Sequence, residues 1–181
     1  MRKGMLAVFW GLMLLTLTMI ELPWEPFRWG MNIAGYGLCA GGMLAAYRRC
    51  AVRSFLIAGL GLAGAMICCV LSFTAGMPDR HAGVIQLLCR MMELFGFAKM
   101  FEGCWKEFRR RRMRDKAMET DLRMKSFVFA FALCSLAEAA FWFIGLEWGT
   151  LLSQLAIRLI YGALMASVML YSEWDRQIPS A

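Results

Sequence analysis

Long apolar stretches follow one another along the whole of this chain, and each is long enough to cross a lipid bilayer. A helix that spans the hydrocarbon core of a membrane needs about 20 mostly apolar residues. The 181 residues are 60% hydrophobic and only 18% charged, a composition that a soluble domain of this size does not carry. The pattern predicts an all-α, multi-pass protein of the cell membrane, a bundle of six transmembrane helices at about residues 4–20, 30–47, 54–76, 82–104, 126–148 and 150–172.

No linker rich in Pro, Gly or Ser divides the sequence, so we predict one domain over residues 1–181. The first apolar stretch follows Arg2 and Lys3, as the core of a signal peptide does. It lacks a small-residue cleavage site before Glu21, and five further apolar stretches come after it. We therefore expect this stretch to be retained as the first helix.

Positive side chains gather on one side of the predicted membrane. Most of the 20 Lys and Arg residues lie near the N terminus, around residues 48–53 and in the segment 105–125, whereas the opposite side carries only Arg28 and Arg80. Loops rich in Lys and Arg stay in the cytoplasm. The sequence therefore predicts that both termini and the basic segment 105–125 are cytoplasmic.

The basic segment carries four consecutive arginines, from Arg109 to Arg112. The spacing of Glu119 and Arg123 suits an i,i+4 ion pair on a helix that continues out of the fourth span. Basic clusters next to a membrane attract anionic lipids, so we expect such lipids as partners here. No nucleic-acid recognition fold accompanies the charge, and we expect no nucleic-acid binding.

Small residues are frequent in the second and third predicted helices, 30–47 and 54–76. Gly37, Gly41 and Ala45 have the small-xxx-small spacing that lets two helices approach closely in lipid. One interpretation is packing inside the bundle. The other is a docking face for a second membrane subunit.

The seven cysteines lie in or at the ends of the predicted spans. A buried cysteine behaves as a small hydrophobic residue, the cytoplasm is reducing, and the chain contains no Cys-x-x-Cys motif. His81 is the single histidine, which argues against a haem or a zinc ion held by several imidazoles. We therefore predict no metal and no cofactor.

Four charged residues lie inside the apolar stretches, where a charge costs at least roughly 2.5 to 3.5 kcal/mol. Counted at 1.5 Å per residue from the outer ends of their helices, all four lie at about the same depth, roughly 12 to 16 Å below the outer surface. They are Arg90, Glu93, Glu138 and Arg158.

Two of the helices carry these charges in matching stripes. Gln86, Arg90 and Glu93 share one face at i, i+4 and i+7, and so do Gln154, Arg158 and Tyr161. The similar stretches that begin at the two glutamines are a weak sign of an internal repeat, a device found in transporters. The predicted polar site therefore consists of Gln86, Arg90, Glu93, Glu138, Gln154, Arg158 and Tyr161.

Two interpretations of this site remain open. The four charges sum to zero, which suits a closed structural network with Arg158 paired to Glu138 and Arg90 paired to Glu93. Alternatively, the arginines face an outward cavity and bind a small anionic ligand, because the planar guanidinium fits carboxylate and phosphate groups.

A catalytic interpretation is weaker. His81 and Cys89 loosely resemble the base and nucleophile of membrane peptidases that process autoinducer peptides. The predicted topology places His81 outside the cell, whereas those peptidases cut on the cytoplasmic side, and two helical turns separate the pair. We therefore predict that the chain is not an enzyme.

We expect a membrane subunit for binding or transport with an outward-facing polar site. In size, topology and site placement the chain resembles the substrate-binding S components of energy-coupling factor vitamin transporters. That resemblance implies a ligand site toward the outside and a small-residue face for a partner, and it assigns no residue roles. The alternative is an assembly, sensor or regulatory protein whose buried charges pair internally or with a partner helix.

Overall fold

The structure is a computed structural model that describes residues 1–18, 25–74 and 79–176. Within these ranges every regular element is an α-helix, which confirms the all-α prediction. The predicted ends of the first and third helices, at residues 20 and 76, lie outside the described residues. The helices are α1 (Arg2–Leu17), α2 (Glu25–Cys50), α3 (Arg53–Thr74), α4 (Asp79–Arg110), α5 (Arg114–Ile144) and α6 (Glu147–Arg176).

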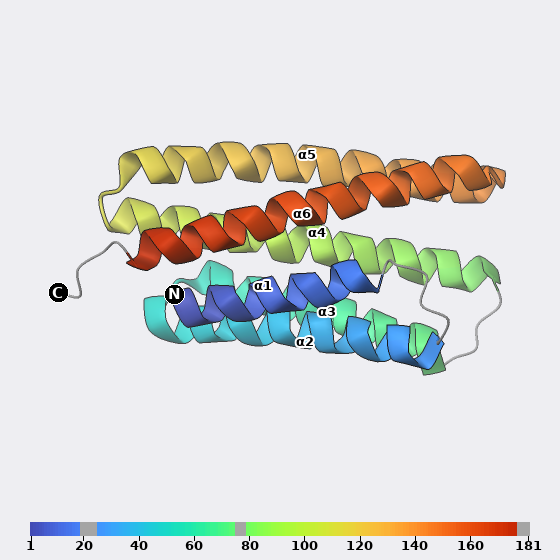
Figure 1. Cartoon of the computed structure of the whole chain (residues 1–181), viewed down its shortest axis with the longest axis horizontal. Helices are drawn as coiled ribbons and strands as arrows, with labels where there is room; N and C mark the ends of the chain where they lie inside the picture. Colours follow the sequence, from blue (N-terminus) through green and yellow to red (C-terminus); the bar gives the residue numbers. More distant parts are fainter. Residues whose placement is uncertain (19–24, 75–78, 177–181) are drawn as a thin grey trace.

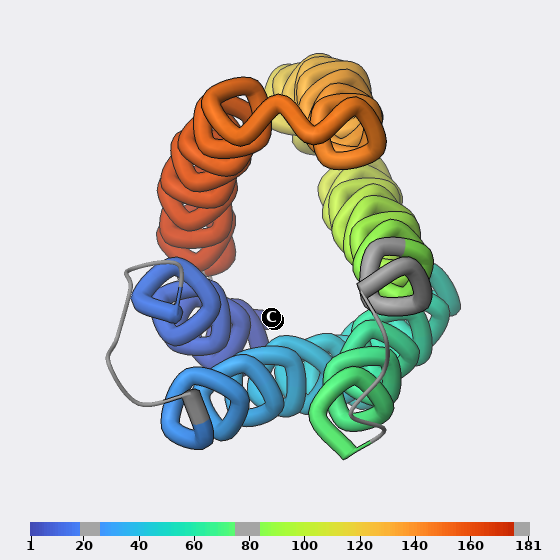
Figure 2. The backbone as a smooth tube through the Cα atoms, turned by 90° about the vertical axis from the view of Figure 1, so that its right-hand side faces the viewer, coloured from blue at the N-terminus to red at the C-terminus, as the bar shows by residue number. Residues whose placement is uncertain are grey.

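The six helices lie side by side along one axis (Figure 1). Each packs against its neighbours in the chain, and α6 also packs against α1. Viewed along the axis, the bundle is therefore a closed ring in chain order (Figure 2).

Three helices, rather than the predicted six, are long and apolar enough in the described residues to cross a membrane by themselves: α3, α5 and α6. The other three have identifiable reasons for falling short. The helix α1 is only 16 residues long, and α2 is diluted by glycine. The helix α4 carries Arg90, Glu93, Lys99 and Glu102 within its apolar part.

The basic segment 105–125 is helical except for a short turn. The helix α4 continues to Arg110 and α5 begins at Arg114, while Arg112 between them has a left-handed backbone with φ of 60°. The predicted ion pair is present, with Arg123 Nη2 lying 2.7 Å from Glu119 Oε1. The pair lies on α5, however, so the prediction that it belongs to a continuation of the fourth helix is wrong, and α4 extends past the predicted end at residue 104 only to Arg110.

Aromatic side chains fill the interior between α4, α5 and α6. Phe97 meets Tyr161 with ring centroids 6.3 Å apart, and Phe101 meets Tyr171 at 6.0 Å, both edge to face, the arrangement that aromatic rings prefer. Phe108 continues the column toward the C-terminal end of α4 and is fully buried. This half of the bundle is therefore tightly packed.

Ion pairs hold the helices together at the end of the bundle where α1 begins and α6 ends. Asp175 of α6 binds the N-terminal amino group at 3.3 Å and Arg111 at 2.9 Å. The fully buried Glu107 binds Arg111 at 2.6 Å and Arg110 at 2.9 Å. Arg110 also donates a hydrogen bond to the carbonyl of Cys50 at the end of α2. The packed interior is thus closed at the end of the bundle where α1 begins and α6 ends.

Glycines let neighbouring backbones touch. A Cβ atom on Gly42 of α2 would lie 2.5 Å from the carbonyl oxygen of Gly4 in α1, and one on Gly61 of α3 would lie 3.2 Å from the Cα of Gly96 in α4. Small residues therefore do pack helices inside the bundle, but not on the predicted face, because Gly37 has only the Met66 sulfur within 4 Å, at 3.8 Å. Gly41, by contrast, faces open space, and its role in docking a partner stays a prediction.

We expect Gly42→Leu to lower the free energy of unfolding by about 1 to 3 kcal/mol or more, because the new side chain overpacks the contact between α1 and α2. Gly41→Leu is the matched control, since it adds the same side chain one residue away where nothing lies within 4 Å. Reversible unfolding in mixed micelles, followed by helical circular dichroism, measures both. Equal losses in the two variants would contradict the packing described here.

Candidate functional site

Arg90 of α4 forms the centre of the polar site. Its Nε lies 3.3 Å from Oε2 of Glu138 on α5, and its Nη1 lies 3.0 Å from Oε2 of Glu93. The same Nη1 is 3.5 Å from the hydroxyl of Tyr161 on α6. One guanidinium therefore joins residues of three helices: its own helix α4, the neighbouring α5, and α6. The face of α4 that points into the ring is directed toward α6 (Figure 2).

Both carboxylates have a second partner. The hydroxyl of Tyr36 on α2 donates to the other oxygen of Glu93, and the side-chain amide of Gln86 donates to Glu138 at 3.1 Å. Glu93 is fully buried and Glu138 nearly so. Hydrogen-bonded and paired carboxylates of this kind are stable in an apolar interior.

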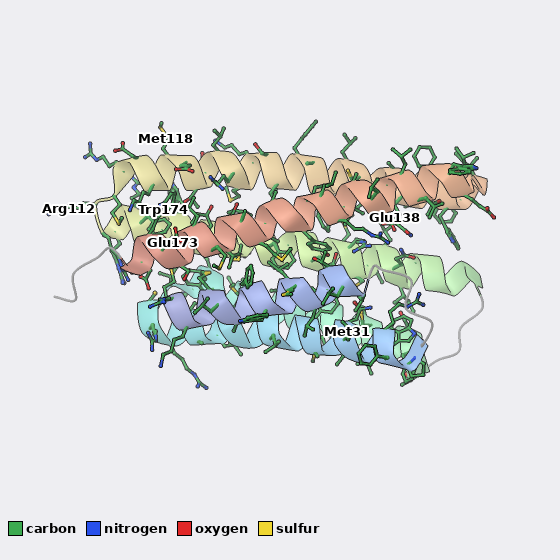
Figure 3. The ribbon with its side chains drawn as sticks, viewed as in Figure 1. Met31, Arg112, Met118, Glu138, Glu173 and Trp174 are labelled. Atoms are coloured by element: carbon green, nitrogen blue, oxygen red, sulfur yellow. The ribbon has the colours of Figure 1, made fainter. Side chains whose placement is uncertain are left out.

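The predicted pair of Arg90 and Glu93 is therefore confirmed. For Glu138 the sequence predicted Arg158 as the partner, whereas the structure places this carboxylate on Arg90 and Gln86. Figure 3 shows Glu138 toward one end of the bundle, with Arg112 in the α4–α5 turn at the other.

A partly open cavity of about 520 Å³ lies beside this network, within the ring. Thr18 at the end of α1, Trp29 near the start of α2 and Leu151 near the start of α6 all line it. The cavity is thus at the end of the bundle opposite to the termini. Five of the predicted site residues line this space, namely Gln86, Arg90, Gln154, Arg158 and Tyr161.

A second, smaller space of about 50 Å³ lies between α4, α5 and α6. It is lined by Glu138 and by Ser135, whose buried hydroxyl has no hydrogen-bond partner in the described part of the chain. A space of this size with several polar groups in its wall suits a water molecule. Gln86, Arg90 and Gln154 line both spaces and so stand between them.

Several residues of the cavity were not predicted from the sequence. The helix α2 contributes Arg28, Trp29, Asn32 and Tyr36, and the hydroxyl of Thr18 donates to Asn32 at 2.6 Å. The i,i+4 spacing of Asn32 and Tyr36 in an otherwise apolar stretch was the signal available for them.

Two cysteines also line the cavity. Cys69 of α3 and Cys89 of α4 both face it, and the Cys89 sulfur lies 3.6 Å from the hydroxyl of Tyr36. They are therefore part of the cavity wall as well as of the packing. The side chain of His81, the other half of the weak catalytic interpretation, lies outside the described residues.

The described residues contain no group of three or more His, Cys, Asp or Glu side chains that is arranged to hold a metal ion. The chemistry that the site offers is instead that of guanidinium, amide and hydroxyl groups. These groups bind anions and polar ligands through hydrogen bonds.

Comparison of the chain with models of protein families, with curated proteins and with solved structures finds no match. The resemblance to S components therefore stays an expectation from the sequence.

Proposed function

We propose that this chain is a multi-pass membrane protein with all six helices in the bilayer and both termini in the cytoplasm, and that it binds a small organic anion from the outer side. Large apolar side chains are exposed on the outside of every helix, a surface that soluble proteins rarely carry. They include Trp10 on α1, Leu38 on α2, Leu60 on α3, Leu88 on α4, Phe129 on α5 and Leu159 on α6. Such a surface suits contact with lipid on all sides of the ring.

The cavity is the observation that carries the ligand proposal. Its volume of about 520 Å³ falls within the range of roughly 300 to 1,000 Å³ typical of small-molecule sites. The described residues that line it include Arg28, Arg90 and Arg158 but no Asp or Glu. Guanidinium groups fit the oxygens of carboxylate and phosphate groups, which favours an anion over a cation.

The other lining groups narrow the chemical class. Gln86, Gln154 and Asn32 offer amides for hydrogen bonds, and Trp29 and Tyr161 offer aromatic surface. Aromatic surface of this kind packs well against a planar ring. We infer a ligand with a carboxylate or phosphate group joined to a planar, partly apolar body.

The two intramembrane arginines have different roles in this proposal. The charge of Arg90 is balanced by Glu93 and Glu138, so this residue fixes the geometry of the cavity wall. Arg158 lines the same cavity from α6. We assign to Arg158 the contact with the anionic group of the ligand, through its bidentate fork.

A closed inner end favours a binding subunit over an open channel. The aromatic column and the ion pairs of Glu107 and Asp175 lie between the cavity and the inner end. A ligand in the cavity reaches the cytoplasm only if these contacts separate. Transport therefore needs a rearrangement, which a partner subunit would drive, and no catalytic role is proposed.

We expect Arg158→Gln to abolish anion binding while the protein stays folded. The probes are benzoate, indole-3-acetate and phenyl phosphate at millimolar concentrations, added to the purified protein in detergent, and the measurement is the shift in melting temperature. The wild type and the control Arg53→Gln, an exposed arginine outside the cavity, should both be stabilised by at least one probe. A wild type that no probe stabilises would contradict the proposed ligand class.

The second candidate function is an assembly, sensor or regulatory protein. The observation that favours it is the pairing of Arg90 with both Glu93 and Glu138, a buried ionic network that differs from the predicted one because Arg90, and not Arg158, holds Glu138. If Arg158→Gln prevents the accumulation of folded protein, instead of removing ligand binding from a folded one, this function gains support.

A further inference from the structure

A long groove follows the outer faces of α4 and α5, away from the cavity. Its inner part has a volume of about 800 Å³ and is lined by Trp105, Arg109, Arg112, Arg114 and Met118. A further part of about 740 Å³ is mostly apolar and is lined by Ala98, Met124, Val128, Phe129 and Ala132, among others. Residues 98, 102, 105 and 109 form one stripe of α4, and residues 118, 121, 125 and 129 form one stripe of α5. The two parts therefore follow one another along the same helix faces, and Lys99, Glu102 and Lys125 also line the second part.

The arginines of this groove are available to a ligand. Among the described residues, Arg109, Arg112 and Arg114 form no ion pair, although Arg109 lies over the ring of Trp105 at 5.2 Å. By contrast, the neighbouring Arg110, Arg111 and Arg123 are all bound to carboxylates. The acidic residue of this part, Asp121, is bound by Lys125 at 2.6 Å.

The start of α5 adds to this positive end. Arg114 is its first residue, and the N-cap residue Met113 makes no side-chain hydrogen bond to the first turn. The first backbone N–H groups of a helix have no partner within the helix, and together with the helix dipole they attract anions. Three arginines and an uncapped helix start therefore lie at the same end of the groove.

Helix length places this end at the level of lipid phosphates. The helices α4 and α5 are 32 and 31 residues long, which corresponds to roughly 46 to 48 Å at 1.5 Å per residue. The hydrocarbon core is about 30 Å thick, and about 40 to 45 Å with its headgroups. Helices centred in the bilayer extend about 8 Å past the core at each end, which is within the headgroup layer.

We propose that this groove binds an anionic phospholipid of the inner leaflet. The phosphate lies among Arg109, Arg112 and Arg114, whose guanidinium groups match phosphate oxygens. One acyl chain follows the apolar part past Val128 and Ala132. This proposal is independent of the ligand in the outward cavity, because the two sites share no residue.

The test compares two triple variants of the full-length protein. Arg109→Gln/Arg112→Gln/Arg114→Gln removes the charges of the groove. Arg48→Gln/Arg49→Gln/Arg53→Gln removes the same number of exposed arginines at the α2–α3 turn, outside the groove. Native mass spectrometry then measures the retention of phosphatidylglycerol against phosphatidylcholine with identical acyl chains, with inorganic phosphate as a competitor.

We expect the wild type and the α2–α3 control to prefer phosphatidylglycerol, and the groove variant to lose this preference by roughly tenfold to a hundredfold, since each basic residue contributes about a factor of five. Ala132→Trp, which fills the apolar part, should weaken retention of both lipids. Equal losses in the two triple variants would overturn the proposal, because they would indicate general charge attraction. Displacement of the lipid by inorganic phosphate at equal concentration would also overturn it in favour of a site for a free anion.

Discussion

Arg90→Leu should lower the free energy of unfolding by about 3 to 5 kcal/mol, the typical cost of removing one partner from a buried ionic group. The reason is that two buried carboxylates, Glu93 and Glu138, share this single guanidinium. Without Arg90 they repel one another across the interface of α4 and α5. Reversible unfolding in mixed micelles, followed by helical circular dichroism, measures the loss.

Arg90→Leu/Glu93→Leu/Glu138→Leu is the informative control. Replacing a whole buried ionic group by apolar residues is often close to neutral, so the triple variant should recover most of the lost stability. Recovery will be incomplete because Tyr36 and Gln86 also lose their acceptors. A cost below about 1 kcal/mol for Arg90→Leu alone would contradict this network, since a buried carboxylate without its cation is costly.

The positions of the helices could be predicted from the sequence because a long stretch of mostly apolar residues marks the middle of each helix. Their ends could not be predicted in this way. The fourth helix was predicted to end at residue 104 and the fifth to begin at 126, yet they end and begin at Arg110 and Arg114. Backbone hydrogen bonding continues where the apolar residues stop, supported by pairs such as Arg123 with Glu119.

The polar site could be predicted in part because depth and helical spacing are properties of single helices. Depth and helical spacing correctly predicted that Arg90, Glu93, Glu138 and Tyr161 lie close together. The choice of partner for Glu138 depends on how each helix is rotated about its axis, and depth carries no such information. Tyr36 was missed because a neutral hydroxyl in a membrane helix costs little and therefore does not stand out in a sequence.

Labelling of introduced cysteines should show that one end of the bundle is accessible from outside the cell and that the other end is not. The cysteines are introduced one at a time into a variant whose native cysteines are replaced by alanine. A membrane-impermeant maleimide added to intact cells should label Gln154→Cys, which lies on the wall of the cavity. The same reagent should leave Arg112→Cys in the α4–α5 turn unmodified. The thiolate is the reacting species, and it forms where water reaches the sulfur. Permeabilised cells should then show labelling of Arg112→Cys.

Leu155→Cys is the matched control for the cavity, because Leu155 neighbours Gln154 but is exposed on the outer surface of the bundle. A thiol in contact with lipid does not ionise and should stay unlabelled in both preparations. Labelling of Arg112→Cys alone in intact cells would reverse the predicted orientation. Equal labelling of Gln154→Cys and Leu155→Cys would contradict a lipid-covered outer surface on α6. If Gln154→Cys stays unlabelled while Arg112→Cys reacts after permeabilisation, the cavity is sealed from the outside, and the closed structural network becomes the better interpretation of the four buried charges.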